Sequence, residues 1–400
     1  MVTRWLAAFE LVSIWTNTPD DIMEAGLYLH IPFCTSKCHY CDFYSVTALS
    51  RKSEIVEAMV KELQTETGFL GSSKPALRTI YFGGGTPSLL QAEDFTRLFD
   101  AIEASYDLSN LEEVTLEANP DDLSPEYLAM LRPFPFNRLS IGVQTLDDAG
   151  LKRINRRHTA AQAKQAVLDS RAAGFTNISI DLMYGLPGQT AELFRQTVNE
   201  ALALPVTHVS SYALSWEEGS VLYKELKEGR LQQAPDELLE AAYFELNAVL
   251  AAHGFQRYEL SNFAKPGYES KHNSSYWNGT SYLGIGPGAH SYNGVLRRFN
   301  FPSIDQYVEG MRRGEPAREL EWLDSNARYN DFIMTSLRTS KGILVKELEK
   351  LFGVSKRYYC LYNARKNLRN GFLVYEDESL RLDEKGLFIA DDICSDLIWV

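Results

Sequence analysis

The chain has 400 residues, of which 45% are apolar, 23% charged and 12% aromatic, enough apolar residues to bury a sizeable core. Its formal net charge of −13 at pH 7 excludes a general nucleic-acid-binding protein, which would carry a basic surface. Five cysteines do not make a disulfide framework, and no run of 18 apolar residues is present, so we expect a protein of the reducing cytoplasm.

The first 25 residues do not share the pattern of the rest of the chain. An apolar stretch from Trp5 to Trp15 is interrupted by Glu10 and is followed by no small-x-small cleavage site, which argues against a secretory signal. We expect residues 1–25 to be an N-terminal extension, and the pattern leaves open whether it is native. Met23 is an alternative initiator, because the patterned domain begins at Gly26.

From Gly26 onward, short apolar runs alternate with longer helical patterns, which is typical of repeated βα units around a parallel sheet. The expected strands cover residues 26–31, 79–83, 113–118, 138–143, 177–182 and 208–212. The expected helices between them cover residues 54–67, 92–104, 125–131, 160–173 and 191–203. Six units are too few for a full eight-stranded barrel. The predicted fold is therefore α/β, with a partial (β/α)6 barrel over residues 26–255.

The loop after the first expected strand carries three cysteines, Cys34, Cys38 and Cys41, in a C-x3-C-x2-C array. Thiolate is a soft ligand that suits zinc or iron and sulfur. A closed zinc site needs four ligands, and His30 or His39 could supply the fourth. The alternative is a 4Fe-4S cluster held by three thiolates, whose fourth iron is open to a small molecule.

Glycine and polar residues follow the other expected strands, and in α/β barrels the chemistry sits at these carboxyl ends. Residues 83–88 read Gly-Gly-Gly-Thr-Pro-Ser, where the absence of side chains would let backbone amides approach a ligand. Glu117, Gln144 and Asp181 end three further strands, and Arg156 follows the fourth. Each of these residues could instead cap a helix, but their spacing along the chain would let them line the same open end of the barrel.

Residues 256–321 are expected to connect the barrel to a second domain. They contain His-Asn-Ser-Ser-Tyr-Trp at 272–277, which we expect to form a loop, and a Gly-Ile-Gly-Pro-Gly turn at 284–288. Histidines and aromatic residues suit a flat apolar ligand with a polar edge. The alternative is a glycine-rich loop packed over the barrel end, with Trp277 in the core and His272 hydrogen-bonded.

From about Trp322 the pattern changes to three helices, expected at residues 327–337, 344–352 and 355–370, and a hairpin of residues 372–375 and 380–382. This order predicts a winged-helix-like, α-rich domain over residues 322–400. Its third helix carries five basic residues, so DNA binding must be considered. However, residues 328–400 hold twelve basic and eleven acidic side chains, so we expect a packing or lid role.

The cysteine array after a first strand resembles the radical S-adenosylmethionine (SAM) superfamily. In that superfamily the open iron of a 4Fe-4S cluster binds SAM, and an electron from the cluster cleaves the sulfonium to a 5′-deoxyadenosyl radical. The cofactor then supplies the chemistry, and the protein orients and shields it. The residues that this resemblance places around the cluster and one or two SAM molecules are Tyr28, Tyr40, Gly84, Gly85, Thr86, Glu117, Gln144, Arg156 and Asp181.

Further motifs are similar to the group that contains oxygen-independent coproporphyrinogen III dehydrogenase and the HemW-type heme chaperones. They are Tyr-Leu-His-Ile-Pro-Phe-Cys, Gly-Gly-Gly-Thr-Pro, Leu-Glu-Ala-Asn-Pro, Gly-Val-Gln and Asp-Leu-Met-Tyr-Gly-Leu-Pro-Gly, and the resemblance runs from about Gly26 to the last residue. The dehydrogenase has a further cysteine where this chain has Phe43, and the chaperones carry His-Asn-x-x-Tyr-Trp, found here at 272–277. Both differences favour the chaperones.

The resemblance implies a protein that binds heme as well as a SAM-coordinated 4Fe-4S cluster and passes heme to an acceptor protein, such as a respiratory one. From the net negative charge we expect no nucleic-acid partner, whereas peripheral membrane contact and a homodimer stay open. The alternatives are an enzyme of porphyrin biosynthesis that oxidatively decarboxylates coproporphyrinogen III, and a radical enzyme with an unrelated substrate. The residues implied to bind heme are His272, Asn273, Tyr276 and Trp277.

Overall fold

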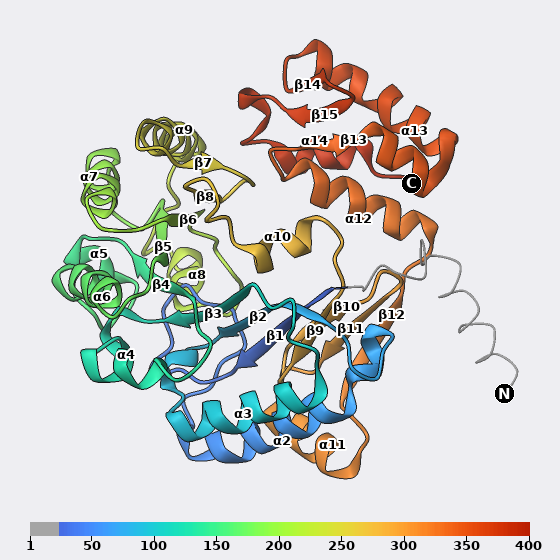
Figure 1. Cartoon of the computed structure of the whole chain (residues 1–400). Coiled ribbons are helices and arrows are strands. Elements are labelled where there is room, and N and C mark those ends of the chain that lie inside the picture. Colours follow the sequence, from blue (N-terminus) through green and yellow to red (C-terminus); the bar gives the residue numbers. More distant parts are fainter. Residues whose placement is uncertain (1–23) are drawn as a thin grey trace, which may run out of the picture.

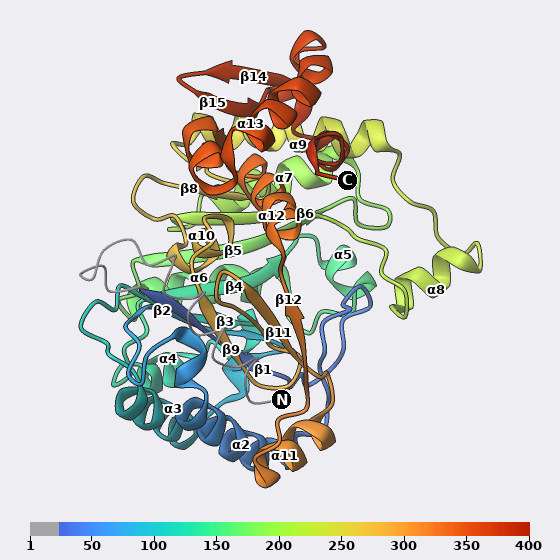
Figure 2. The ribbon, with the colours of Figure 1, turned by 90° about the vertical axis from the view of Figure 1, so that its right-hand side faces the viewer.

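The structure, a computed structural model, describes residues 24–400. The expected N-terminal extension therefore lies almost wholly outside the described residues, as does Met23. Figures 1 and 2 show a main body that contains one large sheet and a smaller C-terminal domain at one end of it. Among residues 24–400, no helix has the length and apolarity needed to cross a bilayer.

Six parallel strands form the centre of the main body and pair with one another in chain order. They are β1 (Ala25–Ile31), β2 (Leu77–Gly84), β3 (Glu113–Ala118), β4 (Arg138–Gln144), β5 (Asn177–Tyr184) and β6 (His208–Ala213). The helices that follow them are α2 (Lys52–Thr65), α3 (Ala92–Ser105), α4 (Pro125–Leu131), α5 (Asp148–Arg153), α6 (Ala160–Ala172) and α7 (Ala191–Leu202). This confirms the predicted partial (β/α)6 barrel (Figure 1).

The side chains of these strands alternate between an apolar outer face and a polar inner face. On β3, Val114 and Leu116 belong to the apolar core between sheet and helices, whereas Thr115 and Glu117 lie on the opposite face. Barrel interiors are commonly filled with branched apolar side chains. Here the interior is polar, so buried groups inside it need hydrogen-bond partners or a ligand.

Residues 256–321 contribute six strands to the same sheet, which the sequence pattern does not indicate. After α8 (Val221–Lys227) and α9 (Asp236–Ala252), β7 (Gln256–Arg257) and β8 (Asn262–Ala264) extend the β6 edge. On the other edge, β9 (Tyr282–Ile285) runs parallel to β1, and antiparallel strands complete a sheet of 12 strands. These are β10 (His290–Tyr292), β11 (Leu296–Asn300) and β12 (Arg318–Trp322), the last preceded by helix α11 (Ile304–Arg313).

The expectation of a loop at 272–277 is wrong, because these residues lie in helix α10 (Lys271–Trp277). The Ser270 hydroxyl caps this helix by accepting a hydrogen bond from the Asn273 amide. The capping serine precedes only seven helical residues and no long apolar stripe, so the sequence periodicity alone is too short to indicate a helix.

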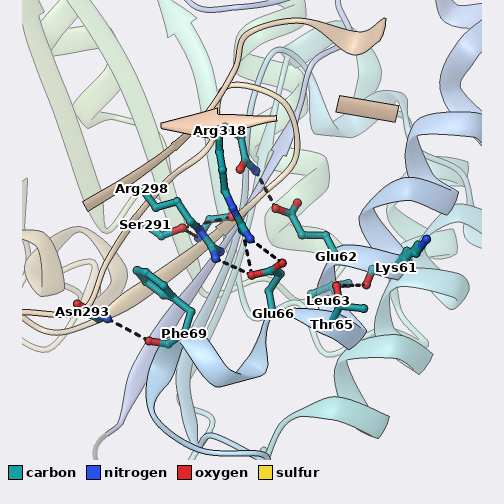
Figure 3. Close-up of polar contacts among 12 residues, drawn as sticks. Lys61, Glu62, Leu63, Thr65, Glu66, Phe69, Ser291, Asn293, Arg298 and Arg318 are labelled. Carbon is teal, nitrogen blue, oxygen red and sulfur yellow. Dashed lines mark hydrogen bonds and ion pairs between the residues drawn. The ribbon is translucent and has the colours of Figure 1, made fainter. Parts of the chain in front are cut away.

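An ionic cluster, buried at Arg298 and half-buried at Glu66 and Arg318, joins the end of α2 to the antiparallel strands (Figure 3). Glu66 lies between Arg298 of β11 and Arg318 of β12, with N–O distances of 2.6 and 2.9 Å. Glu62, one turn earlier, is fully buried and accepts hydrogen bonds from the Tyr307 hydroxyl (2.6 Å) and the Asn300 amide (2.8 Å). Burial raises the pKa of Glu62 above its usual range. Because its partners come from β11 and α11, Glu62 fixes α2 against the extension of the sheet.

We expect Glu62→Ala to lower the free energy of unfolding by about 3 kcal/mol, because it leaves several buried hydrogen-bonding groups unpaired. Chemical denaturation followed by far-ultraviolet circular dichroism measures this loss. The matched control is Glu57→Ala, which removes an exposed glutamate from the same helix. A similar midpoint for the two variants would show that Glu62 does not hold α2 in place.

The C-terminal domain has the predicted winged-helix order. Helix α12 (Ser325–Leu337) is followed by β13 (Ile343–Leu344), α13 (Val345–Arg369), the hairpin β14 (Leu373–Glu376) and β15 (Ser379–Leu382), and α14 (Ala390–Leu397). Gly353 interrupts α13 with a φ of 82°, which explains why the pattern predicts two helices there. Short 3-10 helices elsewhere cover Leu49–Arg51, Thr67–Leu70, Pro87–Leu89, Pro120–Asp122 and Glu384–Gly386.

Candidate functional site

A cavity of about 460 Å³ lies at the carboxyl ends of the parallel strands. Cavities of this size bind small organic molecules and cofactors. Its lining includes all twelve residues that the resemblance places around a cluster and SAM, namely Tyr28, Cys34, Cys38, Tyr40, Cys41, Gly84, Gly85, Thr86, Glu117, Gln144, Arg156 and Asp181. The fold thus brings together residues from five strands and the loops that follow them.

The three loop cysteines are free, half-buried thiols. The Cys34 sulfur accepts a hydrogen bond from the Thr86 hydroxyl (3.5 Å), and the Cys38 sulfur accepts one from Arg156 (3.5 Å). Burial raises the pKa of Cys41 to about 11. A thiolate at this position therefore needs a positive partner, such as the iron of a cluster.

The zinc alternative does not agree with the geometry of the histidines. His30 donates a hydrogen bond to the backbone oxygen of Tyr44 (2.9 Å), and His39 donates one to that of Arg153 (3.1 Å). Within residues 24–400, no three His, Cys, Asp or Glu side chains meet closely enough to hold a single ion. Three thiols spread around a cavity suit a larger group, as a 4Fe-4S cluster is.

Two glycines at the end of β2 allow the cysteine loop to approach the sheet. Gly84 has a φ of 104°, and a Cβ atom there would lie 2.6 Å from Nδ1 of His30. A Cβ atom on Gly85 would lie 2.6 Å from the backbone oxygen of Phe33. Packing alone therefore requires both glycines, and their backbone also borders the cavity.

Two half-buried carboxyl groups line the inner wall of the cavity. Glu117 accepts hydrogen bonds from the Tyr81 hydroxyl (2.6 Å) and the Gly84 amide (3.2 Å). Burial raises the pKa of Glu117 to about 7 and that of Asp181 to about 6. Carboxyl groups with such shifts in a cavity are typical of binding and catalytic sites. As carboxylates they could accept ligand hydroxyl groups or neutralise a ligand cation.

Arg156 is held in a fixed orientation at the cavity wall. It donates hydrogen bonds to Oδ1 of Asn119 (2.7 Å) and to the backbone oxygen of Gly142 (2.5 Å). Asn119 also donates to the Thr86 hydroxyl (3.2 Å), so it links two of the predicted residues. The prediction omitted Asn119, although its position two residues after Glu117 was a usable signal. A fixed guanidinium matches a carboxylate ligand.

Gln144 adopts a left-handed backbone conformation, with a φ of 68°. This conformation is unfavourable for a residue with a Cβ atom and is concentrated at functional sites. Gln144 is the last residue of β4 and lines the cavity. The strain turns the chain at the point where the strand meets the cavity.

The four residues of the predicted heme motif lie at the other end of the barrel. His272, Asn273, Tyr276 and Trp277 belong to α10, and none of them lines the cavity. Helix α10 contacts β2 and lies between the barrel and α12 (Figure 1). The structure therefore places the residues implied for heme outside the cavity, and Tyr28 is the cavity-lining residue that reaches them, with its ring stacked on that of His272 at a centroid distance of 6.3 Å.

His272 is 1% exposed and points into the barrel interior. Its ring nitrogens hydrogen-bond to the hydroxyls of Thr79 (2.8 Å) and Tyr276 (2.9 Å), and its ring stacks on Tyr81. In this docked conformation His272 has no free nitrogen for a metal. Burial lowers its pKa to about 3, so as pH falls below about 6.5 protonation increasingly favours states with His272 outside the barrel.

Glu113, at the start of β3, holds the first turn of α10. Its carboxylate accepts hydrogen bonds from the backbone amides of Lys271 and His272, both at 2.9 Å. The sequence gives no signal for this contact, because the partners are 158 and 159 residues apart. Trp277 is partly buried, and its indole nitrogen has no hydrogen-bond partner among the described residues.

Known protein families match both the barrel and the C-terminal domain of the chain. The radical SAM superfamily matches residues 28–201, and the HemN C-terminal domain matches residues 323–389. The heme chaperone HemW of Lactococcus lactis is 37% identical over 369 residues, which cover 92% of this chain and 95% of that protein. The heme chaperone HemW of Bacillus subtilis is 36% identical, with coverages of 92% and 97%. The chain belongs to the HemW family.

The fold of this HemW-family chain is shared with a solved radical SAM enzyme. Coproporphyrinogen III oxidase (HemN) from Escherichia coli superimposes with a TM-score of 0.81, covering 98% of both chains. The two sequences are 22% identical, so the likeness shows the common fold and not a common activity. It covers the barrel, the extended sheet and the C-terminal domain.

Proposed function

We propose that the chain is a cytoplasmic heme chaperone that keeps a SAM-coordinated 4Fe-4S cluster and transfers heme to an acceptor protein, such as a respiratory heme protein. The observation that carries this proposal is the separation of two sites. The cavity residues lie at the carboxyl ends of the strands, and the His-Asn-x-x-Tyr-Trp segment lies at their amino ends. An enzyme that acts on a porphyrinogen through SAM would need substrate beside the cavity.

The cavity residues fit the cluster and SAM by their chemistry. Cys34, Cys38 and Cys41 would ligate three irons, which leaves one iron open. Glu117 and Asp181 would accept hydrogen bonds from ribose hydroxyls or neutralise a cationic ligand. When bound, the reduced cluster supplies an electron for cleavage of SAM. The chain itself contributes ligands, orientation and exclusion of water.

The heme site would form when α10 leaves its docked position. His272 would then offer an imidazole nitrogen to heme iron, a common axial ligation. Tyr276 and Trp277 would cover a macrocycle face by stacking, and Asn273 would lie at its edge. The reason to expect movement is that both ring nitrogens of His272 are engaged when α10 is docked.

A second candidate function is oxidative decarboxylation of coproporphyrinogen III. It is favoured by the fold shared with HemN and by a cavity lined by all twelve residues that we propose for the cluster and SAM. Against it stands Phe43 at the cavity rim, 63% exposed, at the position of the further cysteine of the dehydrogenases.

The two functions are separated by anaerobic assays of the cluster-loaded protein. We expect uptake of one heme per chain, seen by absorbance titration, and transfer of this heme to an apo-acceptor. With coproporphyrinogen III, SAM and reductant, we expect no decarboxylated porphyrin. Turnover to protoporphyrinogen without stoichiometric heme binding would establish the enzyme instead. Phe43→Ala serves as a control, because it alters the cavity rim and should leave heme uptake unchanged.

A further inference from the structure

Tyr81 contacts both the cavity wall and the helix at the opposite end of the barrel. Its hydroxyl donates a 2.6 Å hydrogen bond to Glu117, which lines the cavity. Its ring stacks on the imidazole of His272, with ring centroids 5.0 Å apart and an angle of 25° between the planes. One side chain, 8% exposed, thus touches a residue of each proposed site.

Strand β3 forms a second connection between the same two places. Glu117 faces the cavity, and Glu113, four residues earlier on the same face of the strand, binds the first amides of α10. A strand rises about 3.3 Å per residue, so the two positions are about 13 Å apart. A short, paired strand therefore fixes the cavity wall and the amino end of α10 relative to each other.

The buried cation Arg138 lies between the same groups. It is 1% exposed, and its three nitrogens have no hydrogen-bond partner among the described residues. Its charge interacts with Glu113, which holds α10, and with Asp181, which lines the cavity. Because charges interact strongly in a water-poor interior, a ligand charge in the cavity would act on Arg138 and, through it, on the Glu113 carboxylate that holds α10.

We propose that Tyr81 is a positioning residue through which SAM in the cavity keeps α10 docked and withholds His272 from heme. This inference rests on the proposed function of the two sites. A cationic ligand beside Glu117 favours its carboxylate form, to which the Tyr81 hydroxyl donates a stronger, charge-assisted hydrogen bond. Tyr81 is then fixed beneath His272, whereas an empty cavity leaves it freer to move. By linkage, SAM weakens heme binding, and heme weakens SAM binding by the same factor.

Amide hydrogen exchange tests this coupling without heme. The cluster-loaded protein is measured anaerobically by mass spectrometry with and without saturating SAM, whose binding is verified by calorimetry. In the wild type we expect SAM to slow exchange of residues 271–277 at least about fivefold, the lower range of typical coupling. In Tyr81→Phe we expect faster exchange without SAM and no slowing when SAM is added.

Two further variants keep the test specific. Tyr106→Phe removes another buried hydroxyl, which donates to the backbone oxygen of Leu63 outside the barrel interior, and should retain the full response. Thr79→Val removes a hydrogen bond to His272 at a position that does not line the cavity. It should speed exchange of α10 and still allow SAM to slow it.

Heme titration of the same proteins separates this inference from the proposed function. We expect the Kd for heme to rise at least about fivefold with SAM in the wild type and to be insensitive to SAM in Tyr81→Phe. Exchange that is unchanged by bound SAM, or a wild-type response in Tyr81→Phe, would overturn the role of Tyr81 and leave the chaperone proposal standing. Absence of heme binding both with and without SAM would refute the proposed chaperone function. The exchange data would still decide whether Tyr81 couples the cavity to α10.

Discussion

Replacement of Cys34 by alanine is expected to abolish the 4Fe-4S cluster and to leave heme binding almost unchanged. Two remaining thiolates cannot hold three irons, so the broad cluster absorbance, the iron content and SAM binding should all fall to near background. Heme affinity measured without SAM should stay within about twofold of wild type, because distant sites contribute nearly independently. The thiol lies at the carboxyl ends of the strands, and α10 at their amino ends.

The matched control is Cys394→Ala, which removes a buried thiol from α14 in the C-terminal domain. It should retain the full cluster content. Iron and sulfide analysis, absorbance and heme titration are made on both variants after identical anaerobic reconstitution. Loss of heme binding together with the cluster in Cys34→Ala would refute the separation of the two sites.

Replacement of His272 by alanine is expected to weaken heme binding at least about tenfold, or about 1.4 kcal/mol, through loss of the iron ligand. The absorption spectrum of any heme still bound should lose the signature of histidine ligation. His272→Ala also leaves the Thr79 and Tyr276 hydroxyls without their partner, so the variant should be less stable. A control must therefore distinguish the effect of lower stability on heme binding from the effect of losing the iron ligand.

His208→Ala provides this separation. His208 is also fully buried in the barrel, and its ring nitrogens hydrogen-bond to the hydroxyls of Ser179 (2.7 Å) and Tyr258 (2.8 Å). Its loss should destabilise the barrel to a similar degree while sparing heme affinity. Equal heme affinities for His272→Ala and the wild type would place heme elsewhere on the chain.

The elements with a clear local period were predicted well. All six parallel strands begin and end within two residues of the expected positions, because each is a short apolar run bounded by turn residues. The order of helices and hairpin in the C-terminal domain was also predicted correctly, because its helices show their own local pattern and a turn separates the two hairpin strands. The strands of the 256–321 region were missed, since β7 and β8 have two and three residues and β9 contains glycine.

The composition of the cavity was predicted more completely than its internal contacts. The position of residues at strand ends and the family resemblance predict twelve site residues, and the fold gathers all of them around one cavity. The prediction does not include Asn119, Tyr81 and Glu113, although each forms a hydrogen bond with a predicted site residue. Their roles depend on which side chains face one another inside the barrel, which no single segment specifies.

By itself, the sequence determined the cysteine loop, the βα repeat, the family resemblance and the identity of the cavity residues. These depend on fixed spacings and on periods of a few residues, which a linear chain displays directly. Only the tertiary structure decided that α10 docks at the amino ends of the strands and that His272 is buried there. The hydrogen bond that holds His272 joins residues 193 positions apart on β2 and α10. Such a contact arises when the sheet and the returning chain pack together, and its energy belongs to the folded barrel rather than to either segment.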